Sequence, residues 1–241
     1  MAEPDGDGTL HVMNDSDNDR RPAWARVLVA VGAGLSLLLV GATLGLLLKI
    51  PSTGTEPEPT PVDIGFAQDM THHHQQAVTM ATLARQHGND QAVRQLAFDI
   101  ETNQRNQIGR MQGWLSVWGR PAQAPGPPMR WMHGATDGHD GHGGSGEGAM
   151  VGPDGRMPGM ATSDELAELR SLRGQAFDVR FLQLMLRHHE GGAGMARSGA
   201  EQAAVPAVRG LATNMLTAQA KESDVMRGML SARNTPPLPL N

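Results

Sequence analysis

An internal repeat is the feature that most constrains how this chain folds. When the sequence is shifted by 115 positions, residues 66–116 align with residues 181–231 without a gap, and 18 of the 51 aligned pairs are identical. The identical pairs include Phe66 and Phe181, Met70 and Met185, His73 and His188, His74 and His189, Met80 and Met195, and Met111 and Met226. A solenoid usually needs three or more units, so two copies indicate a duplication instead.

The first copy predicts a pair of helices. Aromatic residues make up only 3% of the chain, and Tyr is absent, which argues against a sandwich or a barrel. We expect a helix from Pro61 to about His87, where Gly88 would supply a left-handed C-cap. Asn89 would then cap a second helix that ends near Gly119.

The second copy predicts an equivalent pair of helices. Thr162 opens a capping-box pattern, from which we expect one helix to about Ala200, with a bend at Gly174. Pro206 would start the last helix, which runs to about Ala232. Two amphipathic hairpins bury their apolar faces most economically as a four-helix bundle, so the expected fold class is all-α.

A long uncharged stretch precedes the repeat. The 22 residues from Val27 to Leu48 carry no charge, and as a helix they would reach about 33 Å, enough to cross a bilayer core. Its basic neighbours are Arg20, Arg21 and Arg26 before it and Lys49 after it. The positive-inside bias places the N-terminus in the cytoplasm and the rest outside. A cleaved signal peptide is the alternative, but its apolar region would be shorter.

These features divide the chain into seven regions. They are an acidic disordered cytoplasmic tail (1–26), a transmembrane anchor (27–48), a Pro-rich spacer (49–62), a first hairpin (63–118), a Gly/Met/His-rich link (119–162), a second hairpin (163–232) and a short tail (233–241). The net charge of −5 argues against nucleic acid as a partner. The lack of Cys excludes disulfides, thiolate nucleophiles and Cys-ligated metal sites.

The duplicated motif places imidazoles and thioethers on one face of each first helix. At 100° per residue, that face carries Met70, His73, His74 and Met80 in the first copy and Met185, His188, His189 and Met195 in the second. The partner helices present Gln104, Gln107 and Met111, and Gln219, Glu222 and Met226. His72 falls on the opposite side and is expected to face solvent, as is His87.

Imidazole nitrogen with thioether sulfur and few carboxylates is chemistry for a soft metal ion. Cu(I) is the favoured candidate, with Cu(II) or Zn(II) possible at sites that use His alone. The expected ligands are His73, His74, Met80, His188, His189 and Met195, and weaker candidates are Met70, Met185, Met111, Met226, Glu222, His139 and His142. Two alternatives remain: the Met residues fill the core, and the His pairs form a polar network that fixes helix register or responds to pH.

The central link contributes the last two weaker candidates. It carries Met and His residues among many Gly, and the sequence from His139 to His142 could chelate a divalent ion loosely. A flexible segment of this kind would scavenge or sense a metal, because ordering it costs entropy. A disordered linker of biased composition is the alternative.

The two copies resemble a known family. The segments FAQDMTHHHQQAVTMA and FLQLMLRHHEGGAGMA, and MPGMATSDELAEL before the second copy, resemble domain of unknown function 305 over residues 62–231. The resemblance implies a ferritin-like four-helix fold, and some family members are exported copper-binding proteins. Gln107 stands where an acid is frequent in the family, whereas Glu222 retains it, so the two copies need not bind equally.

An enzyme is not expected. A di-iron carboxylate site needs a Glu on each of two helices and a Glu-x-x-His on each of the other two. The sequence contains no Glu-x-x-His, and only Glu101 and Glu222 are core-placed Glu candidates. Two functions therefore remain: an anchored extracytoplasmic copper-binding protein, and a helical interaction or sensor module without metal. An unrecognised metal-dependent redox activity is the enzymatic alternative, and the protein partner is unknown.

Overall fold

The computed structural model describes residues 22–48, 57–132, 151–152 and 155–241. These residues form six α-helices and one short 3-10 helix, and none of them lies in a strand. The chain divides into two units, residues 1–55 and residues 56–241. The expected all-helical class is confirmed.

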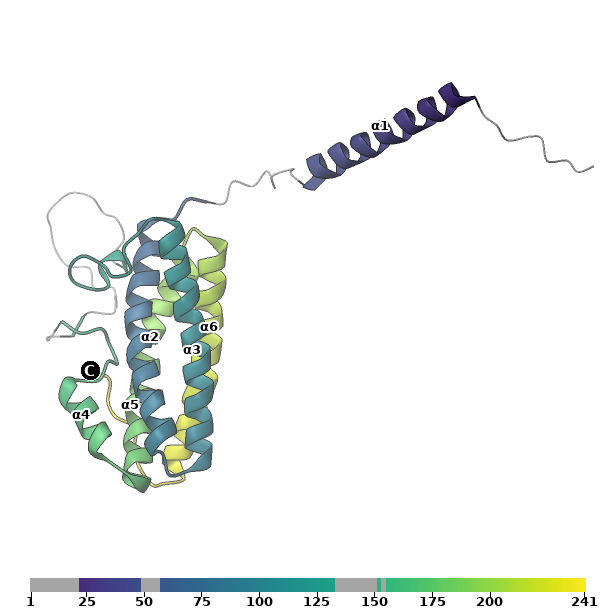
Figure 1. Cartoon of the computed structure of the whole chain (residues 1–241). Coiled ribbons are helices and arrows are strands. Elements are labelled where there is room, and N and C mark those ends of the chain that lie inside the picture. The colour runs from purple at the N-terminus through teal and green to yellow at the C-terminus, as the bar shows by residue number, and fades with distance from the viewer. Residues whose placement is uncertain (1–21, 49–56, 133–150, 153–154) are drawn as a thin grey trace, which may run out of the picture. The chain divides into compact units, whose positions relative to one another are not determined.

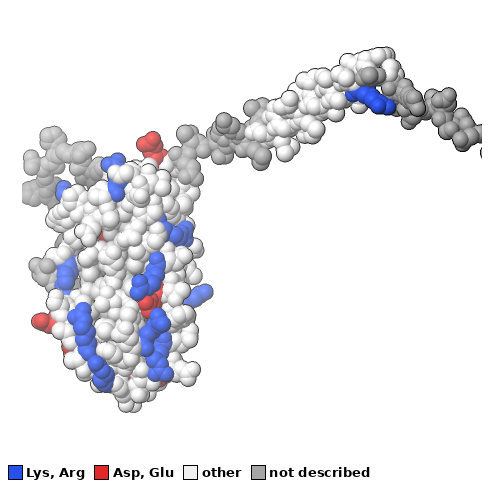
Figure 2. Space-filling view, in the orientation of Figure 1, with Lys and Arg blue, Asp and Glu red and all other residues white. Residues whose placement is uncertain are grey.

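The first unit holds one described helix, α1 (Ala23–Leu48). Within it, Trp24–Gly45 has a mean hydropathy of 2.3 and is long enough to cross a membrane. Its surface is uncharged apart from Arg26 near the N-terminal end (Figure 2). A signal sequence shares this composition, so α1 is a membrane-span candidate by length and composition.

The second unit is a bundle of four long helices: α2 (Pro61–His87), α3 (Gln91–Val117), α5 (Gly174–Gln202) and α6 (Pro206–Ser231). The sequential pairs α2–α3 and α5–α6 form the two hairpins, and α2 packs against α5 between them (Figure 1). The start of α2 lies at the end of α5, and the start of α5 lies at the end of α2. The two repeats therefore pack with their first helices antiparallel.

Each hairpin is held to the turn of the other by one buried carboxylate. Asp63 in α2 accepts hydrogen bonds from the backbone N–H groups of Ala204 (3.1 Å) and Val205 (2.9 Å). Its repeat equivalent, Asp178 in α5, accepts from Asn89 and Asp90, both at 2.9 Å. Both aspartates are at most 1% exposed. These bonds satisfy N–H groups at helix starts that have no helical partner.

Arginines complete the same two turns. Arg94 donates to the carbonyls of Gly88 and Asn89, both at 2.8 Å. Its equivalent, Arg209, donates to the corresponding carbonyls of the second turn. The left-handed cap expected at Gly88 is wrong, because Gly88 has φ −59° and ψ 135° and its carbonyl accepts from Arg94. The residue that caps α3 is Asp90, not Asn89, because its carboxylate accepts from Ala92 N–H.

The single helix expected from Thr162 to about Ala200 is wrong. The capping box at Thr162 is present, but it opens a short helix, α4 (Ser163–Ser171), that ends before α5 begins. Leu172 is extended and Gly174 has φ +63°, a left-handed conformation that Gly adopts without strain. Salt bridges from Glu165 to Arg180 (3.5 Å) and Arg187 (2.6 Å) hold α4 against α5.

Part of the central link is packed onto the bundle. Asp69 in α2 accepts hydrogen bonds from Met129 N–H (2.6 Å) and from the Trp131 indole (2.8 Å), within or beside the 3-10 helix Arg130–Met132. Trp131 lies over Gly65, where any Cβ would collide with the indole. The expectation of a flexible link is therefore wrong for residues 119–132 and 155–162. His139 and His142 lie outside the described residues.

Candidate metal centre

The four repeated histidines lie buried at the middle of the bundle. His73 and His74 come from α2, His188 and His189 come from α5, and each residue is at most 1% exposed. The ring centroids of His73 and His188 are 3.8 Å apart, and those of His188 and His189 are 6.4 Å apart. We call these four side chains the histidine layer.

Small residues make this close approach possible. A Cβ built on Gly192 would lie 2.8 Å from Cε1 of His73, so any larger residue there would displace the imidazole. The equivalent position in α2 is Ala77, which is fully buried. The run of small residues in α5 thus lets its backbone accommodate an imidazole from α2.

Hydrogen bonds fix the tautomer of each imidazole. His74 Nε2 bonds the amide oxygen of Gln107 at 2.7 Å, and His189 Nε2 bonds a carboxylate oxygen of Glu222 at 2.6 Å. His73 Nε2 bonds the carbonyl of Pro158 at 3.2 Å, and His188 Nε2 bonds the carbonyl of His73 at 3.1 Å. Because these oxygens only accept, each Nε2 carries the proton and, in a neutral ring, leaves Nδ1 with a free lone pair.

Three of those Nδ1 atoms have no partner in the described part of the chain. They belong to His73, His74 and His189, and each is buried. The Oε1 and Nε2 atoms of Gln104 and the Oε1 of Gln219 are also buried without a partner. His87 Nδ1 and Arg187 Nε are unpartnered in the same way. Buried polar atoms are rarely left unpaired, so the imidazole nitrogens of the histidine layer are available to a ligand or to water.

Burial keeps the imidazoles of His73, His74 and His188 uncharged. Loss of solvation lowers the pKa of His73 to about 4, and it lowers the pKa of His74 to about 3, with a further contribution from the neighbouring His73. Burial and the adjacent histidines hold the pKa of His188 well below its ordinary value. At neutral pH these rings are therefore neutral, which is the form that binds a metal ion.

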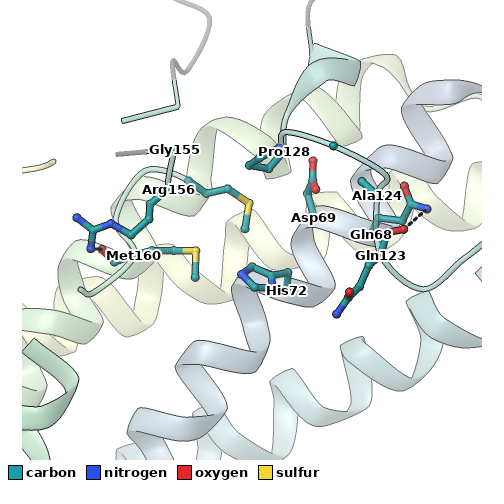
Figure 3. A pocket seen from close by; sticks show the side chains of 11 residues that line it. Gln68, Asp69, His72, Gln123, Ala124, Pro128, Gly155, Arg156 and Met160 are labelled. Carbon is teal, nitrogen blue, oxygen red and sulfur yellow. Dashed lines mark hydrogen bonds between the residues drawn. The ribbon is translucent and has the colours of Figure 1, made fainter. Parts of the chain in front are cut away.

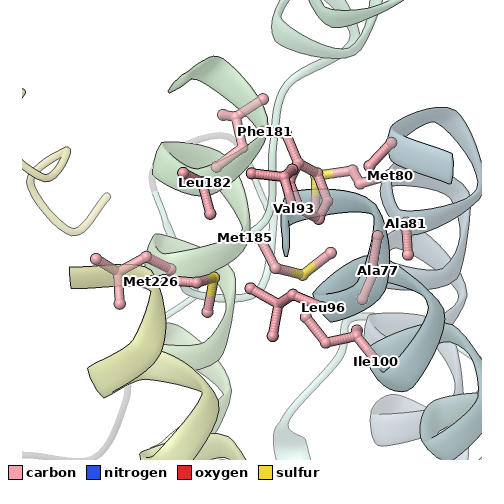
Figure 4. Packing of buried hydrophobic residues seen from close by; sticks show 14 of the residues in the cluster. Ala77, Met80, Ala81, Val93, Leu96, Ile100, Phe181, Leu182, Met185 and Met226 are labelled. Carbon is pink, nitrogen blue, oxygen red and sulfur yellow. The ribbon is translucent and has the colours of Figure 1, made fainter. Parts of the chain in front are cut away.

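The candidate methionines lie in two apolar clusters on either side of the histidine layer. Met80, Met185 and Met226 belong to one cluster (Figure 4), and Met70, Met111 and Met195 belong to the other. All six are fully buried. Met70 and Met185 precede the His pairs by one helical turn, whereas Met80 and Met195 follow them by a rise of about 10 Å. The first two sulfurs are thus nearer to the imidazoles along the helix axis.

The histidine layer contains no group of three imidazole or carboxylate side chains placed to bind one metal ion. Among the described residues, no three His, Asp or Glu side chains are grouped so that they could hold a metal ion. Glu101 is committed to Arg85 (3.0 Å) and Arg105 (2.8 Å). Glu190 pairs with Arg227 at 2.6 Å and is not bonded to an imidazole. A metal ion in the layer would need thioether or amide atoms to complete its coordination.

The two histidines expected to face solvent differ from each other. His72 is exposed, as expected, whereas His87 is half-buried, with its ring centroid 5.7 Å from that of Phe177. His72 lines a pocket of about 290 Å³ together with Asp69, Met157 and Met160 (Figure 3). This pocket lies beside Pro158, whose carbonyl bonds His73.

Sequence reasoning missed how residues 157–161 cover the histidine layer. Gly159 has φ +78° and packs so closely on the α5 backbone that neither it nor Gly191 has room for a Cβ. The backbone of Ala161 exchanges two hydrogen bonds with Gln76. The Pro-Gly pair in MPGM indicates a turn, but nothing local in the sequence shows which helix the turn meets.

Comparison with known proteins gives a consistent family match. The family model described as Domain of unknown function (DUF305) matches residues 63–230. A DUF305 protein from Streptomyces coelicolor is 38% identical, with 74% of this chain and 97% of that one covered and a TM-score of 0.63. A DUF305 fragment from Deinococcus radiodurans is 31% identical, covering 73% and 99%, with a TM-score of 0.57. These structures confirm the expected ferritin-like helical fold.

A more distant structure shares the fold. CopM in the Cu(I)-bound form is 23% identical, with 70% of this chain and 96% of that chain covered and a TM-score of 0.52. Among curated proteins, none matches this chain.

Proposed function

This chain belongs to the DUF305 family, and we propose that it is a membrane-anchored, extracytoplasmic protein that sequesters copper or passes it on. Copper in this proposal is cargo, held as Cu(I) in the histidine layer. The observation that carries the proposal is the set of three buried imidazole Nδ1 atoms, each with a free lone pair and no partner among the described residues. CopM, which shares the fold, has been solved with Cu(I) bound and lends support.

The donor set suits Cu(I) better than a divalent ion. The core candidates are His73, His74, His188, His189, Met80 and Met195, with Met70, Met185, Met111, Met226 and Glu222 as further donors. Neutral nitrogen and sulfur donors are soft, and a single positive charge costs less to bury than two. Outside the cytoplasm thioethers remain usable where thiolates are prone to oxidation, which fits a chain without Cys.

The location follows from α1 and its flanking charges. Arg20, Arg21 and Arg26 lie on the N-terminal side, and Lys49 alone follows. We propose that α1 is an uncleaved anchor with the N-terminus in the cytoplasm and residues 56–241 outside. The Streptomyces coelicolor relative is described as secreted, which supports an extracytoplasmic site for the bundle. We propose no catalytic role, because Glu101 is held by two arginines and is not available as a metal ligand.

A competitive Cu(I) titration of the full-length protein in detergent tests this proposal. The test variant is His74→Gln/His189→Gln, because a Gln amide still donates to Gln107 and Glu222 but offers no imidazole nitrogen. The control is His72→Gln, which changes an exposed imidazole outside the layer. We expect tight binding that is lost in the double variant and retained in the control. Wild-type protein that binds no more tightly than a protein with scattered histidines would overturn the proposal.

A second variant tests the central link. Deleting residues 133–150 removes His139 and His142 and leaves the packed residues around Trp131 and Met157 in place. If binding is lost in this deletion and kept in the histidine double variant, the link is the binding segment and the histidine layer is structural.

A helical interaction or sensor module of the cell envelope is the second candidate function. The observation that favours it is that every imidazole Nε2 already has an acceptor, as a purely structural polar network would require. The same titration separates the two functions, since a structural network predicts no preferential binding of Cu(I) by the layer.

A further inference from the structure

The outer surfaces of the two hairpins carry equivalent grooves that differ in volume and in whether they reach a repeated histidine. A groove of about 560 Å³ runs between α5 and α6, and His189 and Gln219 are among its lining residues. A groove of about 440 Å³ runs between α2 and α3, lined by residues at the repeat-equivalent positions. We call the α2–α3 groove the first groove and the α5–α6 groove the second, after their hairpins. The first groove does not reach His74, which occupies the place of His189 in the first hairpin.

Three side-chain differences account for this contrast. Where the first hairpin has Val78, Arg105 and Ile108, the second has Ala193, Ala220 and Ser223. Each of the second set is smaller than its equivalent. Arg105 is also held across the first hairpin by its salt bridge to Glu101 at 2.8 Å. The first groove is therefore filled above its histidine, whereas the second is open.

The two grooves also differ in charge. The second is lined by three acidic residues, Glu190, Glu201 and Asp224, and two basic ones, Arg197 and Arg227. Arg227 is paired with Glu190 (2.6 Å) and Asp224 (2.8 Å). The only charged residue that lines the first groove is Arg105. Because Glu101 balances the charge of Arg105, the first groove has no net charge, whereas a cleft of net negative charge such as the second attracts a cation.

The floor of the open groove carries donor atoms without partners. His189 Nδ1 and Gln219 Oε1 are both buried and unpartnered within the described residues. The carboxylate of Glu222, which bonds the other nitrogen of His189, has a side chain that is 16% exposed. A cation that enters this groove therefore lies beside Gln219 and His189, although the imidazole of His189 is itself buried, with its side chain 0% exposed.

We infer that the groove between α5 and α6 is the route by which copper reaches and leaves the histidine layer. The second hairpin is then the loading half of the molecule, with His189 as the first imidazole that the ion meets. The first hairpin closes the layer from the other side. This inference rests on the proposed function, since it assigns the path to the copper site proposed above.

The test fills the open groove with the residues of the closed one. The variant Ala193→Val/Ala220→Arg/Ser223→Ile copies the first hairpin in the full-length protein, and none of these residues is a proposed ligand. The control, Val78→Ala/Ile108→Ser, makes the opposite change in the first hairpin. The measurement is stopped-flow transfer of Cu(I) from a chelator complex, together with equilibrium affinity.

We expect the filled variant to take up Cu(I) at least about tenfold more slowly, with its affinity little changed, because a blocked path slows binding and release alike. The control should bind at the wild-type rate or faster. An unchanged uptake rate in the filled variant overturns the route, as does a loss of affinity with no change in rate. A wild type that takes up no Cu(I) overturns the proposed function instead.

A copper-free measurement tests the route on its own. Diethyl pyrocarbonate acylates accessible neutral imidazoles, and mass spectrometry identifies the modified residue. His74 and His189 are both buried, so both should react slowly; in the metal-free protein we expect His189, which lines the open groove, to react before His74, and the filled variant to protect His189. Equal reactivity of the two histidines would overturn the route, whatever the copper affinity.

Discussion

In the first hairpin the imidazole of His74 is hydrogen-bonded to the neutral amide of Gln107, whereas in the second His189 is bonded to the carboxylate of Glu222. The groove above His74 is filled, and the groove above His189 is open. Yet the two hairpins share their buried fastenings: Asp63 corresponds to Asp178, as Arg94 corresponds to Arg209. The duplication has kept the residues that hold the bundle together and varied those that surround one histidine.

The largest expected effect comes from breaking the shared fastening. Asp178→Ala leaves the N–H groups of Asn89 and Asp90 without their acceptor, and it should lower the free energy of unfolding by about 3–5 kcal/mol. Asp63→Ala should cost at least as much, because Asp63 also bonds Thr60. Urea denaturation of the full-length protein in detergent measures both losses.

The exposed Asp99 on α3 provides the control for these variants. Asp99→Ala removes only a bond to Gln95 and should change stability by less than about 0.5 kcal/mol. A loss at Asp178 as small as this would show that the two turns are not held by their carboxylates. A large loss at only one of the two aspartates would show that the hairpins are not equivalent in structure.

The second prediction concerns the free energy of unfolding as the pH is lowered. The pKa of His73 is lowered to about 4 and that of His74 to about 3, so below pH 6.5 the unfolded chain binds protons that the folded chain does not. Stability is therefore full above about pH 6.5 and falls as the pH drops, by about 1.4 kcal/mol per pH unit for each histidine. These two contributions, together with that of His188, whose pKa is lowered in the same direction, should appear between about pH 6 and pH 4.5.

The histidine contribution to the pH dependence of stability can be separated from that of the carboxylates by its pH range and by the variant His74→Gln. Glu101 and Glu165 have carboxyl pKa values lowered by their arginine partners, so their stabilisation is lost only below the ordinary value of 4.5. His74→Gln should reduce the slope of unfolding free energy against pH by about 1.4 kcal/mol per unit, and His72→Gln should leave it unchanged. A slope that His74→Gln does not alter would mean that this ring is charged in the folded protein.

The sequence predicts the local features of the two repeats, but it does not predict the contacts that each repeat makes with the other. Periodicity and the repeat shift place His73, His74, His188 and His189 on inward faces, because the period of a helix is a local property. Asp63 and Asp178 are an identical pair at the same 115-residue shift, three positions before the aligned segment, and this pair indicated that the two turns are held in the same way. Its role was missed because each aspartate acts on a turn about 90 to 140 residues away.

Other features depended on tertiary contacts. The break before α5 and the cover formed by residues 157–161 depend on how the link packs across α2 and α5, which composition alone does not encode. A Gly/Pro-rich segment predicts flexibility because its unfolded entropy is high, yet Met157 and Met160 are buried against the bundle. The openness of the α5–α6 groove was readable in principle from Ala193, Ala220 and Ser223, but only once their positions on a surface were known.

The third prediction tests the space around the His73 ring. Gly192→Ala places a methyl group 2.8 Å from Cε1 of His73 and should cost about 1–3 kcal/mol of stability through overpacking. Gly210→Ala on α6 is the matched control, since nothing lies within 4 Å of its Cβ position, and it should stabilise the helix by up to about 1 kcal/mol. Thermal denaturation measures both. Equal effects of the two changes would show that Gly192 does not receive the imidazole.

The smallest expected effect comes from exchanging the hydrogen-bond partners of the two outer histidines, which are an amide in the first hairpin and a carboxylate in the second. In Glu222→Gln, His189 keeps a hydrogen-bond acceptor, as His74 already does with Gln107, so stability should change little. The lost carboxylate no longer increases the basicity of the imidazole, and Cu(I) affinity should fall about tenfold. The reverse change, Gln107→Glu, should raise the affinity, because a carboxylate bonded to His74 would increase the basicity of that imidazole in the same way. A fall of a hundredfold or more in Glu222→Gln would make the carboxylate itself a ligand, whereas no fall would mean that this partner does not tune the copper site.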